Sequence, residues 1–283
     1  MRNSNGMKFC AAALLLGAGV LCLNAQFQFP GAKYAKGQDV SPTFEGWEGN
    51  PDGSYTLYFG YYNRNTEEEI DVPIGAENTF DLGNGDQGQP THFYTGRRWF
   101  VFKVVVPKDW PQDKRVVWTL TTNGKTNLSK GWLQAEWEID KALISKNAIS
   151  DPFLRTSNSN PSPDNMPPVV TGSSAQTVTL PASATLTATA TDDGLPKPGP
   201  GDRGGRVQGV LIRWIHYRGP GKVHFDPDVS PAVYGKPLTS ETKVSFSMPG
   251  MYRIRAIATD GAAFTTFDVD VKVNPSAPAG NAR

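Results

Sequence analysis

Apolar side chains recur at every second residue along much of the chain, and this period constrains the fold more than any other feature. Between Thr185 and Thr191 the sequence reads Thr-Leu-Thr-Ala-Thr-Ala-Thr. Successive side chains of a β-strand point to opposite faces, so this alternation places the apolar residues on one face. The same period returns at 210–214, 223–225, 244–246, 252–258 and 267–273. We therefore predict an all-β chain whose apolar faces are buried between facing sheets.

The N-terminal half shows the same period less regularly. It is present at 55–61, 116–120 and 133–139, and Asn123-Gly124 is typical of a tight hairpin. Phe100, Phe102, Val104 and Val106 share one face, with Val101 and Val105 opposite. That pattern predicts a central strand covered on both sides. A single helical turn is expected at 140–146.

Composition divides the chain into two predicted domains. Residues 151–166 lose the apolar period and are rich in Ser, Asn and Pro, as in a semi-rigid linker. We expect two tandem β-sandwich (immunoglobulin-like) domains after a signal peptide. The predicted boundaries are 1–25 for the signal peptide, 26–40 for an N-terminal extension, 41–150 for a sandwich of no assigned family, 151–166 for the linker, 167–274 for the second sandwich and 275–283 for a flexible tail.

The first residues have the features of a secretory signal. Arg2 and Lys8 precede an apolar stretch at 9–23, and Asn24-Ala25 offers a small residue for cleavage. The stretch is shorter than the roughly 20 residues that span a bilayer. We expect a secreted or periplasmic protein with no stable membrane insertion after cleavage. A membrane-anchored protein with an uncleaved leader is the alternative.

Charge and cysteine usage exclude several classes of protein. Both cysteines, Cys10 and Cys22, lie in the predicted leader, so the mature chain is expected to have no disulfide and no cysteine ligand. Loss of the leader's two basic residues takes the formal net charge from +1 to −1. Such a balance gives no field to attract nucleic acid. The densest basic spots, at 97–98 and at 253 and 255, are interpreted as ordinary strand residues.

Three segments of the C-terminal half resemble a known family. Pro167-Pro168-Val169-Val170, Thr-Ala-Thr-Asp-Asp-Gly at 189–194, and Pro-Gly-Met-Tyr-Arg-Ile-Arg-Ala-Ile-Ala-Thr-Asp-Gly at 249–261 are similar to immunoglobulin-like repeats of the polycystic-kidney-disease and cadherin-like type. The resemblance covers residues 167–274. It implies a seven-strand sandwich with Trp214 in the core and Tyr252 near a corner. Such repeats serve as spacers or adhesion modules on exported bacterial proteins. The loop at 195–206 is longer than these repeats usually have.

The three histidines do not have the spacing of a metal site. His216 and His224 fall on strands that we expect to be neighbours, where solvent-facing side chains are a simpler interpretation than a shared metal ion. His92 is expected in a loop beside 97–98. We predict no catalytic residue, no cofactor-binding residue and no metal ligand.

Two other patterns have a structural explanation. Gly83 to Gly88 matches G-x-G-x-x-G, but no helix follows, so a surface turn is expected. Asp192, Asp193 and Asp260 lie at predicted strand ends, where turn capping and calcium binding are both open. The acidic run 67–69 is interpreted as solvated.

Aromatic residues crowd the N-terminal half. We expect most to be core residues, because a sandwich without disulfides needs large apolar side chains. The set is Trp47, Tyr61, Tyr62, Trp99, Trp110, Trp132 and Trp137.

The leading hypothesis is an exported, non-enzymatic structural or interaction protein of the cell envelope or extracellular space. Its partner would be an unknown protein or glycan. The alternative is a carbohydrate-binding protein that uses exposed aromatics of the N-terminal domain. An enzyme would need a pocket, for which the loops 75–98 and 192–208 are the candidates.

Overall fold

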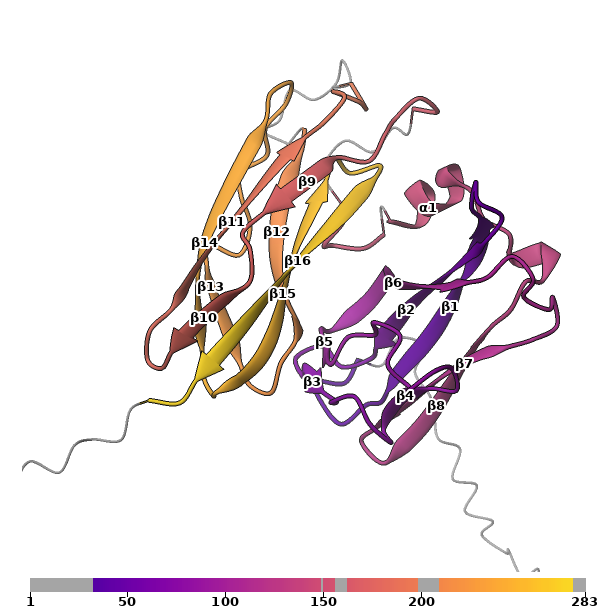
Figure 1. Ribbon diagram of the computed structural model, residues 1–283, viewed down its shortest axis with the longest axis horizontal. Coiled ribbons are helices and arrows are strands. Elements are labelled where there is room, and N and C mark those ends of the chain that lie inside the picture. The colour runs from indigo at the N-terminus through magenta and orange to yellow at the C-terminus, as the bar shows by residue number, and fades with distance from the viewer. Residues whose placement is uncertain (1–32, 149, 156–161, 198–208, 277–283) are drawn as a thin grey trace, which may run out of the picture. The chain divides into compact units, whose positions relative to one another are not determined.

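The computed structural model describes residues 33–148, 150–155, 162–197 and 209–276 (Figure 1). The predicted signal peptide, part of the predicted linker, most of the long loop at 195–206 and the end of the tail lie outside these residues. In the part of the chain that is described, no helix is long and apolar enough to cross a membrane.

Strands dominate the structure, which confirms the all-β fold class. The first half contains two short helices, η1 (Ala135–Trp137) and α1 (Lys141–Ala148). Its strands are β1 (Val40–Gly49), β2 (Tyr55–Asn63), β3 (Ile70–Asp71), β4 (Asn78–Phe80), β5 (His92–Phe93), β6 (Gly96–Val106), β7 (Val116–Thr122) and β8 (Lys125–Gly131).

These strands form a structure that we call the first sandwich. One sheet has the order β1-β2-β6 and the other β4-β7-β8, with β3 and β5 paired separately. Phe59 of β2 and Trp118 of β7 are fully buried, and their rings meet edge to face with centroids 6.4 Å apart. Large apolar residues on alternate positions thus fill the space between the sheets.

The predicted hairpin at Asn123-Gly124 is confirmed. It joins β7 to β8 through two residues with φ angles of 48° and 74°. Positive φ at both positions gives the turn a twist that matches its strands, and Asn and Gly tolerate that conformation best. The predicted helical turn at 140–146 is also present, as α1.

Two expectations for this half were wrong. The strand at 100–106 is not central, because β6 pairs only with β2 at the edge of its sheet, and Val105 is 57% exposed. The alternating segment 133–139 is not a strand, because Ala135–Trp137 forms a 3-10 turn. Apolar alternation alone does not say whether a second sheet covers the reverse face.

A bulge in β6 bends this edge strand. Three residues, Trp99 to Val101, lie opposite the single residue Gly60 of β2. Phe100 has φ of 50°, which is unusual for a bulky side chain. Bulges of this kind redirect the backbone groups and side chains of a strand.

The described residues of the second half form eight strands, which we call the second sandwich. They are β9 (Val169–Gly172), β10 (Gln176–Thr179), β11 (Ala184–Thr191), β12 (Leu211–Arg218), β13 (Val223–Asp226), β14 (Leu238–Phe246), β15 (Gly250–Thr259) and β16 (Phe264–Asn274). One sheet has the order β13-β14-β11-β9 and the other β10-β16-β15-β12 (Figure 1).

This strand order is that of an immunoglobulin-like sandwich, as the sequence resemblance predicts. Trp214 of β12 is fully buried and donates its indole N–H to Ser240 Oγ at 3.0 Å. Tyr252, near the start of β15, donates its hydroxyl to the carbonyl of Met248 at 2.8 Å. That bond is the tyrosine corner of this fold class. The first edge strand is split into β9 and β10, so eight strands replace the expected seven.

The bulge generates a stability prediction. A methyl group at Gly60 would collide with the backbone oxygen of Arg98 and with Glu45 Oε1, whereas one at Gly49 would meet no atom within 4 Å. We expect Gly60→Ala to lower the free energy of unfolding by about 2 kcal/mol through overpacking. Gly49→Ala, in the same sandwich, is the control. Urea unfolding measures both, and equal stabilities would contradict the prediction.

Candidate functional site

The two sandwiches pack against each other along β12. The described residues from Lys33 onward form one compact unit. Ile215 and Tyr217 of β12 and Ile257 of β15 form an apolar cluster with Ala148 and Leu154, which follow the first sandwich. The opposite face of β12, with Trp214, lies in the core of the second sandwich. This strand is therefore buried on both faces.

The glycine-rich segment 83–88 is a turn, as predicted, and it contacts the second sandwich. Arg218 makes a two-pronged ion pair with Asp86, with N–O distances of 2.7 and 3.0 Å. It also donates to the carbonyl of Gln89 at 2.8 Å, and Tyr217 donates its hydroxyl to the carbonyl of Gly88 at 2.5 Å. Fork-shaped pairing of this kind fixes orientation as well as adding attraction.

Arg255 of β15 bonds to both sandwiches. Its guanidinium pairs with Asp268 at 2.7 and 2.9 Å and lies 3.5 Å from the centroid of the Tyr217 ring. It also donates to the carbonyl of Val101, in the bulge of β6, at 2.6 Å. The bulge thus presents a backbone acceptor to the other sandwich.

For Arg98 and Arg255, the interpretation as ordinary strand residues was wrong. Arg98 and Arg255 are buried, and Arg98 pairs with the buried Asp151 at 2.9 Å. Burial raises the pKa of Asp151, and the charge of Arg98 only partly offsets this effect. A buried charge requires a partner of opposite charge. Arg98 has Asp151 and Arg255 has Asp268.

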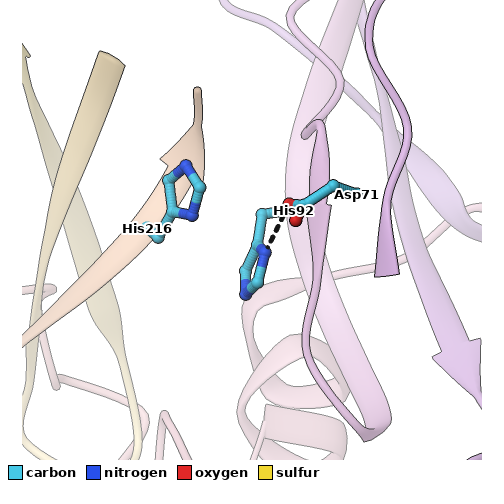
Figure 2. Close-up of side chains that lie close together, drawn as sticks. All are labelled: Asp71, His92 and His216. Carbon is cyan, nitrogen blue, oxygen red and sulfur yellow. Dashed lines mark hydrogen bonds and ion pairs between the residues drawn. The ribbon is translucent and has the colours of Figure 1, made fainter. Parts of the chain in front are cut away.

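Four titratable side chains meet beside this contact, and Figure 2 draws three of them, Asp71, His92 and His216. His92 of β5 bonds through Nδ1 to Asp71 at 2.7 Å and through Nε2 to Glu69 at 3.2 Å. His216 of β12 stacks on it, with ring centroids 4.6 Å apart. Figure 2 shows the two rings facing each other, with Asp71 beside His92. We call Glu69, Asp71, His92 and His216 the junction cluster.

Local structure places each member of the cluster. Asp71 lies directly opposite His92 in the short β3–β5 pair, so their side chains are neighbours. The backbone N–H of His216 donates to the hydroxyl of Tyr94 at 2.8 Å, which ties β12 to the residue that follows β5. The stacking of the two histidines therefore depends on the contact between the sandwiches.

The two histidines have opposite electrostatic surroundings. Burial lowers the pKa of His92, but the hydrogen bonds and charges of Asp71 and Glu69 outweigh it and leave the pKa raised. Burial, and then the charge of His92, lowers the pKa of His216 to about 4. Burial raises the pKa of Asp71, but the hydrogen bond and charge of His92 bring it below its usual value.

A cavity of ≈ 700 Å³ adjoins the cluster. All four members of the junction cluster line it. The other side chains on its wall are Tyr94, Phe153, Arg213, Trp214, Ile215, Lys222, Val223, His224, Phe225 and Asp228. Carboxylates, imidazoles and cations thus converge on one concave space, which is typical of a binding site.

The structure corrects the expectations for the histidines. His216 and His224 are not on neighbouring strands, because β12 and β13 belong to different sheets. The partner of His216 is His92, which lies in β5 and not in a loop. Only His224 is exposed, as expected of a solvent-facing residue. The sequence analysis did not single out Asp71. It interpreted Glu69 as part of a solvated acidic run, but Glu69 contacts His92.

The aspartates at the strand ends cap turns. Asp260 Oδ1 accepts the N–H groups of Ala262 and Ala263 at 2.6 and 2.7 Å, and Asp193 accepts that of Leu195 at 2.8 Å. Among the described residues, three side chains bring possible metal-ligand atoms together, and they are Asp71, His92 and His216. Asp192, Asp193 and Asp260 do not belong to that group.

The N-terminal aromatics divide into three groups, and the expectation that most of them are core residues was wrong. Trp47 and Tyr61 are core residues, as expected, and Tyr62 and Trp137 are 43% and 42% exposed. The other three, Trp99, Trp110 and Trp132, are half-buried, and each has a basic side chain over its ring.

Comparisons with known proteins describe the fold only. No family model matches the chain, and no curated protein matches its sequence. Similar solved structures include the PKD domain of human KIAA0319, at 17% identity over 45% of this chain and 99% of that one, with a TM-score of 0.23.

Two others cover more of this chain. The D00-D0 domain of intimin is 10% identical over 83% of this chain and 99% of its own, with a TM-score of 0.25. The fibronectin(III)-like modules of Clostridium thermocellum CbhA are 13% identical over 83% and 95%, with a TM-score of 0.24. Scores this low carry no argument about function. The immunoglobulin-like character of residues 169–274 follows from their strand order and tyrosine corner.

Asp192 generates a pH prediction. Burial, with the charges of Asp260 and Asp193, raises its pKa from 3.8 to about 6. The folded state therefore holds the proton more tightly than the unfolded state, and ionisation between pH 4 and 6 lowers stability. At pH 7.5 we expect Asp192→Asn to stabilise the fold by on the order of 1 kcal/mol, allowing for solvent screening.

Thermal unfolding from pH 3.5 to 7.5 checks this. The gain in Tm is expected to vanish at the acid end, where wild-type Asp192 is protonated. Glu241→Gln, which removes an exposed carboxylate of the same sandwich, is the control and is not expected to raise Tm. A gain that does not change with pH would rule out the electrostatic explanation.

Proposed function

We propose that this chain is an exported, non-enzymatic structural or interaction protein of the cell envelope or extracellular space. Its two sandwiches would act as one rigid body that holds binding surfaces at a fixed angle. The observation that carries the proposal is the side-chain contact around β12. Tandem modules joined only by a linker have no such contact, and their relative orientation is free.

The chemistry of the contact supports rigidity. Arg218 and Arg255 each form fork-shaped ion pairs and also donate to backbone carbonyls of the first sandwich. These bonds lie beside the apolar cluster of Ile215, Tyr217 and Ile257. Ion pairs that are shielded by apolar packing are screened less by salt than exposed ones.

The composition of the cavity supports a non-enzymatic role. Its wall contains no serine, threonine or cysteine side chain among the described residues. Both nitrogens of His92 are engaged with carboxylates, so neither is free to take a proton from a substrate. Covalent catalysis by a hydroxyl or thiol group needs that nucleophile next to a free base. The described wall of the cavity does not bring such a pair together.

Arg218→Ala tests the proposal. It removes the pair with Asp86, and we expect the two sandwiches to lose their fixed orientation while each stays folded. The matched control is Arg253→Ala, which removes a similar fork-shaped pair with Asp270 inside the second sandwich. Distances between spin labels on the two sandwiches are expected to broaden only in Arg218→Ala.

The functional measurement is co-sedimentation of the chain with an envelope fraction of the cell that produces it. We expect Arg218→Ala to weaken that association about tenfold relative to Arg253→Ala, because two surfaces must then be oriented at the time of binding. Absence of association for the wild-type chain, or equal association for both variants, would contradict the proposal.

A second candidate function is carbohydrate binding by the first sandwich. Trp137 is exposed beside Phe44, with ring centroids 5.6 Å apart. The half-buried Trp132 also stacks on Phe44, at 6.4 Å with an interplanar angle of 18°. Neighbouring aromatic faces at a surface offer apolar area with a fixed geometry, which suits the apolar face of a sugar ring.

A glycan-binding screen tests this alternative. We expect any glycan that binds the wild-type chain to bind Trp137→Ala at least about tenfold more weakly, because each stacked ring contributes on the order of 1–2 kcal/mol. Tyr62→Ala is the control, since Tyr62 is equally exposed on the same sandwich. A screen with no binding, or equal losses in both variants, would remove this candidate.

A further inference from the structure

We propose that Asp71, His92 and His216 form a binding site for a divalent transition-metal ion of the Zn²⁺ type. One carboxylate oxygen and one ring nitrogen from each histidine all lie within 4.8 Å of one another. Two of the ligands come from the first sandwich and the third from the second. The inference goes beyond the proposed function and does not depend on any partner.

The distances are close to those of a coordination sphere. Ligand atoms bound to tetrahedral zinc at about 2.0–2.1 Å are about 3.3 Å apart. The Asp71 oxygen and His92 nitrogen are already 2.7 Å apart in their hydrogen bond. Small side-chain rotations therefore bring the three atoms to zinc distances, because the strands already place all three residues together.

The donor set selects the kind of ion. Two imidazole nitrogens with a carboxylate oxygen suit zinc and its transition-metal neighbours, whereas Ca²⁺ and Mg²⁺ prefer oxygen ligands only. With neutral imidazoles, the carboxylates of Asp71 and Glu69 carry two negative charges, which a divalent cation neutralises. Glu69, 3.2 Å from His92, is placed as the group that orients the His92 ring.

His216 has an independent feature that points to a ligand. The residue is only 2% exposed, and its Nε2 atom is buried without a hydrogen-bond partner. A buried polar atom without a partner is uncommon in a native structure and is often explained by an ion or another ligand. His224, on the wall of the same cavity, is exposed and outside the cluster.

The cavity gives the ion a route and a free position. A zinc ion held by three protein ligands keeps its fourth position for water or another small ligand. The ≈ 700 Å³ space beside the cluster has room for both the entering ion and that water. Because His216 belongs to the other sandwich, bound metal would cross-link the two sandwiches at their contact.

The experiment uses the full chain after metal removal by a chelator. Zn²⁺ is titrated by calorimetry, and Tm is measured with excess Zn²⁺, Mg²⁺ or Ca²⁺. We expect one Zn²⁺ per chain and a rise in Tm of about 5 °C or more at 100-fold excess over Kd, with no comparable rise for Mg²⁺ or Ca²⁺. Absence of saturable Zn²⁺ binding overturns the proposal.

Variants locate the bound ion. His92→Gln and His216→Gln are each expected to weaken Zn²⁺ binding at least about tenfold, while His224→Gln binds as the wild type does. If either of the first two variants fails to fold, Co²⁺ bound to the wild-type chain decides instead. The intense visible absorption of four-coordinate Co²⁺ with nitrogen ligands supports the site, and the weak absorption of six-coordinate Co²⁺ overturns it. Zn²⁺ affinity unchanged in both folded variants overturns it as well.

Discussion

The structure depends on one constraint: β12 is apolar on both faces. Trp214 and its neighbours fill the second sandwich, and Ile215 and Tyr217 on the reverse face must also be covered. A strand of this kind is stable only between two layers. The first sandwich provides the second layer, and the ion pairs of Arg218 and Arg255 lie around the apolar contact. The stacked histidines and the adjoining cavity are consequences of this packing.

The period of two in the sequence was enough to predict much of the fold. It identified the inward faces of strands such as β11 and β14, because their buried residues alternate with less buried ones. It failed for β6, which is an edge strand, because Val105 on its reverse face is exposed and Val101 is partly buried against the second sandwich rather than by a sheet of its own. It also failed at 133–139, where a 3-10 turn interrupts a pattern typical of a strand.

The candidate site was less predictable, for a physical reason. His92 and His216 are 124 positions apart, and their meeting depends on how two separately formed sandwiches pack. Local spacing carries no information about such a contact. One signal was present: Leu-Ile-Arg-Trp-Ile-His-Tyr-Arg at 211–218 has apolar residues on both strand faces. Only a partner outside its own sandwich explains that composition.

The two-faced burial of β12 also limits how this chain can be cut or recombined. Immunoglobulin-like units are commonly exchanged between proteins as self-sufficient pieces, yet the second sandwich alone would expose Ile215, Tyr217 and Ile257 to water. An apolar strip of that kind on a sheet favours self-association. The pair of sandwiches, rather than either one, is therefore the smallest piece of this protein that we expect to remain monodisperse in solution.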